Sequence, residues 1–192
     1  MNYYISDLHL FHANCIQFDN RPFVDLDDMH ETMRSKWNRK ITNDDIVYIL
    51  GDISCHGNNE SLIAYISTLK GRKILIRGNH DDILDYRYQR LFEEVCDYKE
   101  IVDSVDGQTH DLVLCHYPIF SWKRMGKGTI LLYGHTHNSP EDDYYQICLA
   151  NIVNNDGNHV YKTEARAINI GCMKPWMNYE PRTFKEIYKG AY

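Results

Sequence analysis

Acidic, amide and imidazole side chains recur in five short motifs along the first 137 residues of the chain. The motifs read Asp-x-His, Gly-Asp, Gly-Asn-His-Asp, a single His, and Gly-His-Thr-His. Their candidate metal ligands are Asp7, His9, Asp52, Asn79, His116, His135 and His137. Mixed imidazole and oxygen ligands without thiolate suit Mn²⁺, Fe²⁺, Zn²⁺ or Ni²⁺. Because seven ligands are too many for one such ion, we expect two divalent ions that share a bridging carboxylate.

Two ions bound in this way have a characteristic chemistry. A pair about 3.5–4 Å apart holds a hydroxide between the ions and clamps the oxygens of an in-line phosphoryl displacement. Phosphoester hydrolysis by attack of that metal-bridging hydroxide is therefore the reaction that the ligand set predicts. Each motif alone is more commonly a turn with a structural role. Five such motifs in one chain, in order, make coincidence improbable.

Short apolar runs precede the motifs and predict the strands that must position them. In the first half we expect strands over residues 3–6, 46–50 and 73–77, and helices over residues 27–40, 62–69 and 83–95. Ligands of sheet proteins gather outside the carboxyl ends of strands, so residues remote in sequence can converge on one edge. Gly51, Gly78 and Gly134 permit the sharp exits that this convergence needs.

The second half of the chain is expected to be mostly sheet. Strands are predicted over residues 98–105, 112–115, 129–133 and 168–170, with a turn at residues 106–107. We interpret the polar stretch 139–162 as an excursion that contains a loop or a hairpin. No internal repeat, low-complexity tract or linker interrupts the sequence, which favours a single domain over residues 1–192.

Composition and charge exclude several classes of protein. The 192 residues contain 21 Lys and Arg against 27 Asp and Glu, and the net charge of −6 argues against extended nucleic-acid binding. The longest apolar runs are five residues, far short of the roughly 20 that cross a bilayer, so we expect no membrane partner. Six cysteines without a C-x-x-C pair indicate reduced thiols, and we expect no secretory signal because the first residues lack its basic start and apolar stretch. These features predict a cytoplasmic protein.

The complete pattern from Asp7 to His137 resembles the calcineurin-like metallophosphoesterase superfamily. The resemblance implies a four-layer αββα sandwich of the α/β (α+β) class, with two mixed β-sheets flanked by helices. It also divides the ligands between a first metal (Asp7, His9, His137) and a second metal (Asn79, His116, His135), with Asp52 as the bridge. His80 would stabilise the phosphate or protonate the leaving oxygen. Asp81 would orient His80 or lie as an exposed loop carboxylate.

The segments 11–15 and 21–23, which read Phe-His-Ala-Asn-Cys and Arg-Pro-Phe, are similar to a small group of bacterial and phage phosphoesterases. We hypothesise that His12 and Asn14 reach the substrate phosphate, although they could instead fix a long loop. Arg21 is a candidate phosphate clamp.

Other polar residues match no motif. The basic aromatic stretch 122–127 could guide an anionic substrate, but a solvated loop is the simpler interpretation. His30, His110 and His159 are expected on the surface. His56 would matter only if the structure placed it beside the metals.

The sequence therefore predicts a dinuclear metal-dependent hydrolase of a phosphomonoester or phosphodiester, with a small phosphoester or a nucleotide as substrate. A Ser/Thr phosphoprotein phosphatase is disfavoured, because Ile-Ser-Cys-His follows the Gly-Asp motif where such enzymes carry Asp-Arg-Gly. Two alternatives are a small nuclease and a non-catalytic metal-binding scaffold on the same fold. The intact ligand set argues against the scaffold.

Overall fold

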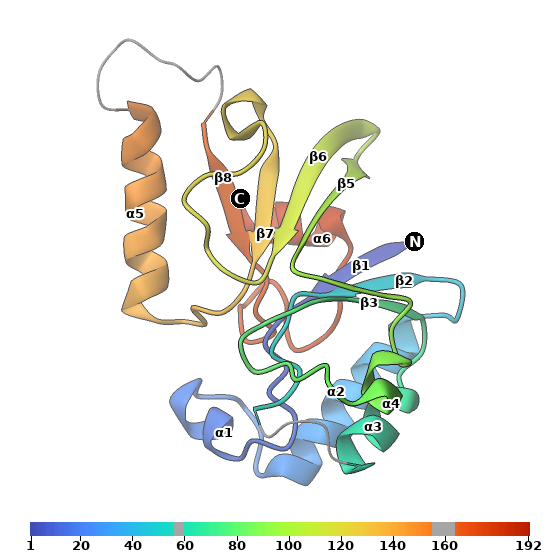
Figure 1. The fold of residues 1–192 in the computed structure, drawn as a ribbon. Coiled ribbons are helices and arrows are strands. Elements are labelled where there is room, and N and C mark those ends of the chain that lie inside the picture. The colour runs from blue at the N-terminus through green and yellow to red at the C-terminus, as the bar shows by residue number, and fades with distance from the viewer. Residues whose placement is uncertain (56–59, 155–163) are drawn as a thin grey trace.

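The computed structural model describes residues 1–55, 60–154 and 164–192. Two four-stranded sheets pack against each other, and helices cover their outer sides (Figure 1). Buried side chains from both sheets, such as Ile49 and Leu114, belong to one hydrophobic core. This is the αββα sandwich that the family resemblance implies. None of the helices within the described residues is long and apolar enough to span a membrane.

The first sheet contains four parallel strands in the order of the chain. They are β1 (Asn2–Ile5), β2 (Ile46–Ile49), β3 (Arg72–Ile76) and β4 (Glu94–Cys96). Most residues of β1, β2 and β3 are buried, as expected for parallel strands covered on both faces. Before β3 the chain forms the helices α1 (Asn14–Phe18), α2 (Leu26–Lys40) and α3 (Glu60–Ser67). Helices α2 and α3 lie on the side of the sheet away from the second sheet (Figure 1).

The prediction of a helix over residues 83–95 is wrong. Asp85 caps only a single short turn, α4 (Tyr86–Gln89), and the chain then enters β4. Val95 pairs with Leu75 of β3, so this segment completes the edge of the first sheet. Pairing with an existing strand satisfies the backbone groups of the segment and outweighs its local helical periodicity.

The second sheet is mixed. Its strands are β5 (Tyr98–Val105), β6 (Gln108–Cys115), β7 (Ile130–Tyr133) and β8 (Arg166–Asn169). Strands β5 and β6 form an antiparallel hairpin, whereas β6, β7 and β8 are parallel. Asp106 and Gly107 have φ values of 49° and 84°, as a two-residue type I′ turn requires. Strand β6 begins four residues before the predicted strand 112–115, because its polar start pairs with β5. A short 3-10 turn, η1 (Met125–Lys127), precedes β7.

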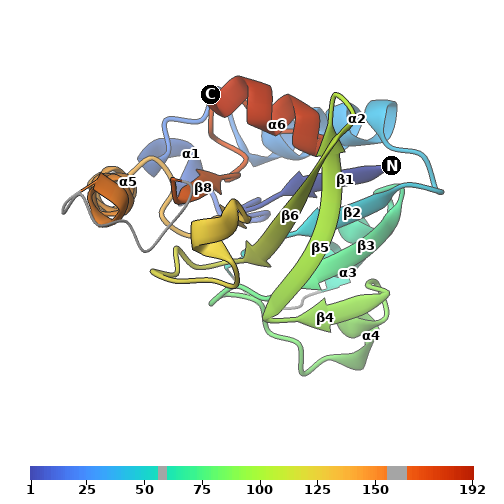
Figure 2. The same ribbon diagram turned by 90° about the horizontal axis from the view of Figure 1, so that it is seen from above.

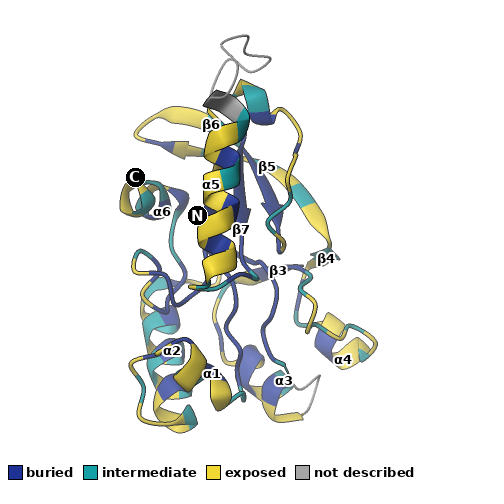
Figure 3. Ribbon diagram, turned by 90° about the vertical axis from the view of Figure 1, so that its left-hand side faces the viewer, coloured by how far each residue is buried: buried dark blue, intermediate teal, exposed yellow. Residues whose placement is uncertain are grey.

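The loop or hairpin predicted within 139–162 is wrong where the structure describes it, because α5 (Pro140–Asn154) is a helix. Proline at the first helical position and acidic residues in the first turn favour this helix start. Tyr145 and Leu149, one turn apart, are buried against the second sheet. The outward side of α5 is mostly exposed (Figure 3). The remainder of the predicted excursion lies outside the described residues.

The C-terminal helix α6 (Phe184–Ala191) packs against both sheets. It contacts β1 of the first sheet and β5 and β8 of the second (Figure 2). Thr183 and Glu186 form a capping box at its start, in which each side chain bonds the other's backbone N–H. The helix therefore links strands of both sheets.

Candidate metal centre

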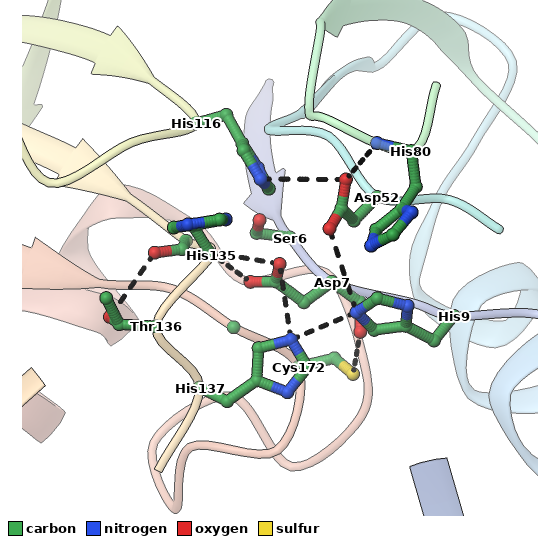
Figure 4. A network of polar contacts seen from close by, with 12 residues as sticks. Ser6, Asp7, His9, Asp52, His80, His116, His135, Thr136, His137 and Cys172 are labelled. Atoms are coloured by element: carbon green, nitrogen blue, oxygen red, sulfur yellow. Dashed lines mark hydrogen bonds and ion pairs between the residues drawn. The ribbon is translucent and has the colours of Figure 1, made fainter. Parts of the chain in front are cut away.

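The ends of strands from both sheets meet at one place, where the candidate ligands lie close together (Figure 4). Asp7 and His9 follow β1, and Asp52 follows β2. His116 follows β6 and His135 follows β7 of the other sheet. The backbone N–H of His135 donates to both carboxylate oxygens of Asp7 at 3.1 Å, which joins residues 128 positions apart. The convergence predicted from the strand ends is confirmed.

Asp7, His9 and His137 form what we call the first group. One ligand atom from each lies within 4.8 Å of the others. Nε2 of His9 is 3.0 Å from Nε2 of His137, which is 3.8 Å from Oδ1 of Asp7. Burial raises the pKa of Asp7, and burial together with neighbouring His137 lowers the pKa of His9 to about 2. A buried carboxylate beside the neutral imidazole of His9 is the environment that a metal cation stabilises.

Asp52, His116 and His135 form the second group, with ligand atoms again within 4.8 Å of one another. Oδ1 of Asn79 lies 3.2 Å from Nε2 of His116, so the amide adds a fourth oxygen or nitrogen donor. Oδ1 of Asp52 is 3.6 Å from Nε2 of His116, and Oδ2 is 3.9 Å from Nε2 of His9. One buried carboxylate therefore faces both groups.

Five of the candidate ligands adopt a left-handed backbone conformation. They are Asp7 (φ 56°), His9 (φ 50°), Asp52 (φ 52°), His135 (φ 70°) and His137 (φ 51°). Such a conformation is uncommon for residues other than glycine and costs about 1–3 kcal/mol each. Hydrogen bonds between the loops hold it, since Asp7 N donates to Gly51 O and His9 N donates to Asp52 O. Strain of this kind clusters at functional sites.

The three glycines before the ligands serve two different purposes. Gly51 has a φ of 80°, which confirms the sharp exit expected there. Gly78 and Gly134 are not among the residues with positive φ. Instead, a Cβ at Gly78 would collide with the carboxylate of Asp52, and one at Gly134 would collide with Asp7. At these two positions glycine is required by close approach and not by backbone angle.

The far nitrogens of the first-group histidines contact side chains that the sequence analysis missed. Nδ1 of His9 is 2.8 Å from Sγ of Cys55, and Nδ1 of His137 is 2.7 Å from Oδ1 of Asp19. Burial alone would lower the pKa of His137, but the hydrogen bond to Asp19 and the charge of Asp7 outweigh it and raise that pKa. Both contacts leave Nε2 directed toward the centre of the group. Contacts of this kind orient the ring and increase its basicity toward a metal.

The second group is supported by backbone. Nδ1 of His116 lies 2.7 Å from the carbonyl oxygen of Leu50, which accepts its proton and leaves Nε2 facing the group. The ring of His135 packs against the rings of His116 and Tyr117, at centroid distances of 5.1 and 4.9 Å. The His116 ring is fully buried.

A pocket of about 520 Å³ opens over both groups. Besides candidate ligands, it is lined by His12, Phe18, Asp19, Cys55, His80, Thr136, Asn138, Ser139 and Glu141. His80 is exposed, and its ring centroid is 6.0 Å from that of His9. Among the described residues, no Lys or Arg lines this pocket. Asn14 is exposed at the start of α1 and is not part of the lining, so the structure does not bring it together with His12 in the pocket.

Residues 3–160 of the chain match the sequence model of the calcineurin-like phosphoesterase family. The chain belongs to this family. The family resemblance inferred from the motifs is confirmed, and the fold described above is consistent with it.

This phosphoesterase is similar in sequence or in structure to several known proteins. It is 32% identical over 143 residues to the uncharacterised protein MJ1445 of Methanocaldococcus jannaschii, covering 74% of this chain and 72% of that protein. It is 32% identical over 159 residues to the gene 66 protein of Mycobacterium phage D29, covering 71% of this chain and 78% of that protein. A crystal structure of AQ665, a protein of unknown function from Aquifex aeolicus, matches 98% of both chains with a TM-score of 0.65 and 24% identity. This last likeness shows the fold.

Arg21 of this phosphoesterase does not face the pocket, so its prediction as a phosphate clamp is wrong. Its guanidinium is fully buried and donates to the carbonyl oxygens of Leu8 and Asp7 at 2.8 and 3.0 Å. It also pairs with the carboxylate of Asp19 at 2.8 Å. Arg21 therefore fixes the loop after β1 and the carboxylate that contacts His137.

Asp81 does not orient His80, and it is not an exposed loop carboxylate. Its oxygens accept from the backbone N–H groups of Asp52, Ile53 and Gly78 at 2.8, 3.1 and 2.8 Å. These bonds tie the loop after β3 to the loop after β2. Asp81 positions the chain around Asp52 instead.

The remaining polar residues lie away from the site. In the basic stretch, Lys123 pairs with Glu100 and Arg124 pairs with Asp111, so acidic side chains neutralise two of its three cations. His30 is half-buried between the rings of Phe11 and Tyr65, which corrects its placement on the surface. His110 is also half-buried, against the rings of Phe184 and Tyr188 of α6. His56 and His159 lie outside the described residues.

Proposed function

We propose that this family member is a dinuclear metal-dependent hydrolase of phosphoesters. In this proposal, Asp7, His9 and His137 hold one divalent ion, and Asn79, His116 and His135 hold the other. Asp52 is shared by the two ions. The observation that carries the proposal is the position of the Asp52 carboxylate, whose two oxygens face Nε2 of His9 and Nε2 of His116 at 3.9 and 3.6 Å.

The chemistry of the donors fits divalent ions. Asp7 and Asp52 are 0% and 2% exposed, and buried carboxylates require a compensating charge. Among the described residues no Lys or Arg side chain pairs with either carboxylate. Imidazole and oxygen donors together suit Mn²⁺, Fe²⁺, Zn²⁺ or Ni²⁺. When bound, a pair of such ions lowers the pKa of coordinated water toward neutrality and neutralises charge on the phosphoryl oxygens.

His80 is the residue that we assign to proton transfer. It is exposed in the pocket, and its backbone N–H donates to Oδ1 of Asp52 at 3.0 Å, which fixes the main chain beside both groups. An imidazole in this position can donate a hydrogen bond to the phosphate and a proton to the leaving oxygen. His12 lines the same pocket, and in this proposal it supplies a further polar contact to the substrate.

The pocket suits a small phosphomonoester or phosphodiester, including a nucleotide. Its volume of about 520 Å³ falls within the usual range of small-molecule sites. Without Lys or Arg in the described lining, the attraction for phosphate depends on the bound ions. The net charge of −6 disfavours extended nucleic acid as a partner. Six cysteines without a disulfide suit a reducing compartment such as the cytoplasm.

The test is turnover by metal-stripped protein to which each metal is returned singly. The substrates are a phosphomonoester, a linear phosphodiester, cyclic nucleotides and a short oligonucleotide. We expect hydrolysis of one ester class with Mn²⁺ and none in the stripped protein. Lys123→Ala, whose side chain pairs with Glu100 away from the pocket, serves as the matched control with unchanged activity. Metal binding without turnover on any ester would favour the non-catalytic scaffold, and preference for the oligonucleotide would favour a nuclease.

A further inference from the structure

A third cluster of metal-binding side chains lies in the same pocket. His9, His12 and Cys55 each present one ligand atom, and these three atoms lie within 4.8 Å of one another. Sγ of Cys55 is 2.8 Å from Nδ1 of His9, and the ring of His12 meets that of His9 edge-on at a centroid distance of 5.9 Å. All three residues line the pocket of about 520 Å³.

This cluster differs chemically from the two groups described above, because it contains sulfur. Two imidazoles and a thiolate are soft or borderline donors, and they favour Zn²⁺ and related thiophilic ions over Mn²⁺. A tetrahedral ion with bonds of about 2.0–2.3 Å needs only three protein ligands when the fourth position is open to solvent. We propose that His9, His12 and Cys55 form a separate site for a thiophilic divalent cation, and that this site competes with the first group for His9.

The competition follows from the donor capacity of imidazole. A neutral imidazole has one lone pair available, because its other nitrogen carries a proton. In the described arrangement Nε2 of His9 faces His137, while Nδ1 faces Cys55. When a thiophilic ion binds, the Cys55 thiol releases its proton to solvent as the sulfur–metal bond forms. The His9 lone pair then serves this ion, and the first group is left with Asp7 and His137.

Binding at this site would therefore inhibit the enzyme without occupying the whole dinuclear centre. Cys55 is half-buried and reaches the pocket, so an ion can enter from solvent. The inhibitory part of this proposal rests on the proposed dinuclear function. The thiolate site itself rests only on the geometry of the three side chains.

The experiment uses reduced, Mn²⁺-loaded protein titrated with Cd²⁺, which stands in for Zn²⁺ and has a thiolate charge-transfer band in the ultraviolet. Free Mn²⁺ is followed in the same samples by electron paramagnetic resonance. We expect the band to saturate at one thiolate per chain while one equivalent of Mn²⁺ is released. Both readouts are independent of turnover. A protein inactive on every ester would therefore disprove the proposed function but would not change the result expected in this experiment.

Three variants sharpen the result. Cys55→Ser should abolish the band and retain Mn²⁺ at Cd²⁺ concentrations that strip it from the original protein. His12→Ala should weaken Cd²⁺ binding at the band by about tenfold or more, since even residues outside the ligand shell contribute factors of 10–100. Cys96→Ser is the matched control, because Cys96 is also half-buried but lies in β4, outside the pocket. It should behave as the original protein does.

The outcomes separate the thiolate site from a simple hydrogen bond between Cys55 and His9. An absent band in the original protein, or an equal band in Cys55→Ser, overturns the site. A band that saturates without release of Mn²⁺ overturns the sharing of His9. If His12→Ala leaves the Cd²⁺ affinity unchanged, the site does not include His12 and the three-residue assignment is wrong.

Discussion

The two groups of candidate ligands have equivalent donors but are supported in different ways. In the first group the far nitrogens of His9 and His137 contact the side chains of Cys55 and Asp19. In the second group the far nitrogen of His116 contacts a backbone carbonyl. Backbone support is fixed by the fold, whereas side-chain support depends on the identity and protonation of the supporting residue. The first ion should therefore be the one whose affinity a substitution or a competing ion can change.

The support of the first group extends over several residues. Asp19 contacts His137, and Arg21 pairs with Asp19 from the buried side. Burial alone would raise the pKa of Asp19, but His137 and Arg21 outweigh it, so that pKa is lowered and the carboxylate stays charged. A charged acceptor makes the imidazole of His137 a stronger metal ligand. We infer that the acidic side chain missed by the sequence motifs controls the strength of the first site.

The strongest way to abolish the difference between the groups is to remove the residue that they share. Asp52→Asn should lose both ions together, because a neutral amide bridges two cations poorly, and activity should fall to that of the metal-free protein. Elemental analysis after gel filtration gives the metal content. Asp143→Asn, the same change at an exposed position of α5, is the control. Full metal content in Asp52→Asn would mean that the bridge is misplaced.

A second variant separates ion binding from catalysis. His80→Ala should keep both ions but hydrolyse esters with poor leaving groups about 10²–10⁴-fold more slowly, since it removes the proton donor. Esters with good leaving groups should be affected less, because their departure needs little protonation. His110→Ala, whose ring packs against α6, is the matched control. An unchanged rate on the poor leaving group would remove His80 from the mechanism.

A third variant tests the comparison directly. Asp19→Asn keeps an acceptor for His137 but removes the charge, and the affinity of the first ion should fall about 10–100-fold, as is typical when a residue supporting a ligand is changed. Calorimetric titration of stripped protein, with the two binding steps resolved, measures the effect. The buried charge of Arg21 loses its partner, so the protein should also lose stability. General destabilisation weakens both steps, and only a selective loss of the first step supports the comparison.

The candidate ligands could be predicted from the sequence, because their residue types, their spacing and the apolar runs before them are all visible in it. Asp7, His9 and the later histidines each follow an apolar run, and parallel strands bring such positions to one edge. Asp19 and Cys55 carry no comparable signal, because they act through contacts between segments. Asp19 and Arg21 lie only two residues apart, which suggests an ion pair between them. The sequence does not show, however, whether the guanidinium points inward or toward the substrate.

The errors in the fold have a similar origin. The segment 83–95 has helical periodicity, yet its last residues complete the sheet edge as β4, and local pattern does not reveal an available partner strand. The polarity of the segment 139–162 favours a loop, whereas the spacing of Tyr145 and Leu149 suits a helix that covers the second sheet. Asp142 added to that error, because its carboxylate is buried in a polar network that only the folded chain explains.

The hydrogen-bond network around Asp142 gives the prediction with the smallest expected effect. In this case the two ligand groups should lose metal affinity equally. Thr136 lies between His135 of the second group and His137 of the first, and its hydroxyl donates to Asp142 at 2.7 Å. Asn169 donates to the backbone carbonyl of His137 at 3.2 Å and to Asp142 at 2.9 Å. One buried set of hydrogen bonds therefore holds the single loop that supplies a ligand to each group.

Thr136→Val removes the hydroxyl while preserving the shape of the side chain. Asn169 retains two other acceptors, so we expect a loss of only about 1 kcal/mol in the free energy of unfolding, the usual worth of one hydrogen bond. Because the loop serves both groups, both metal affinities should fall by the same small factor. Urea unfolding measures the stability, and the two-step titration measures the affinities. A selective loss at the first ion would mean that its sensitivity arises in this shared loop and not in the side chains behind His9 and His137.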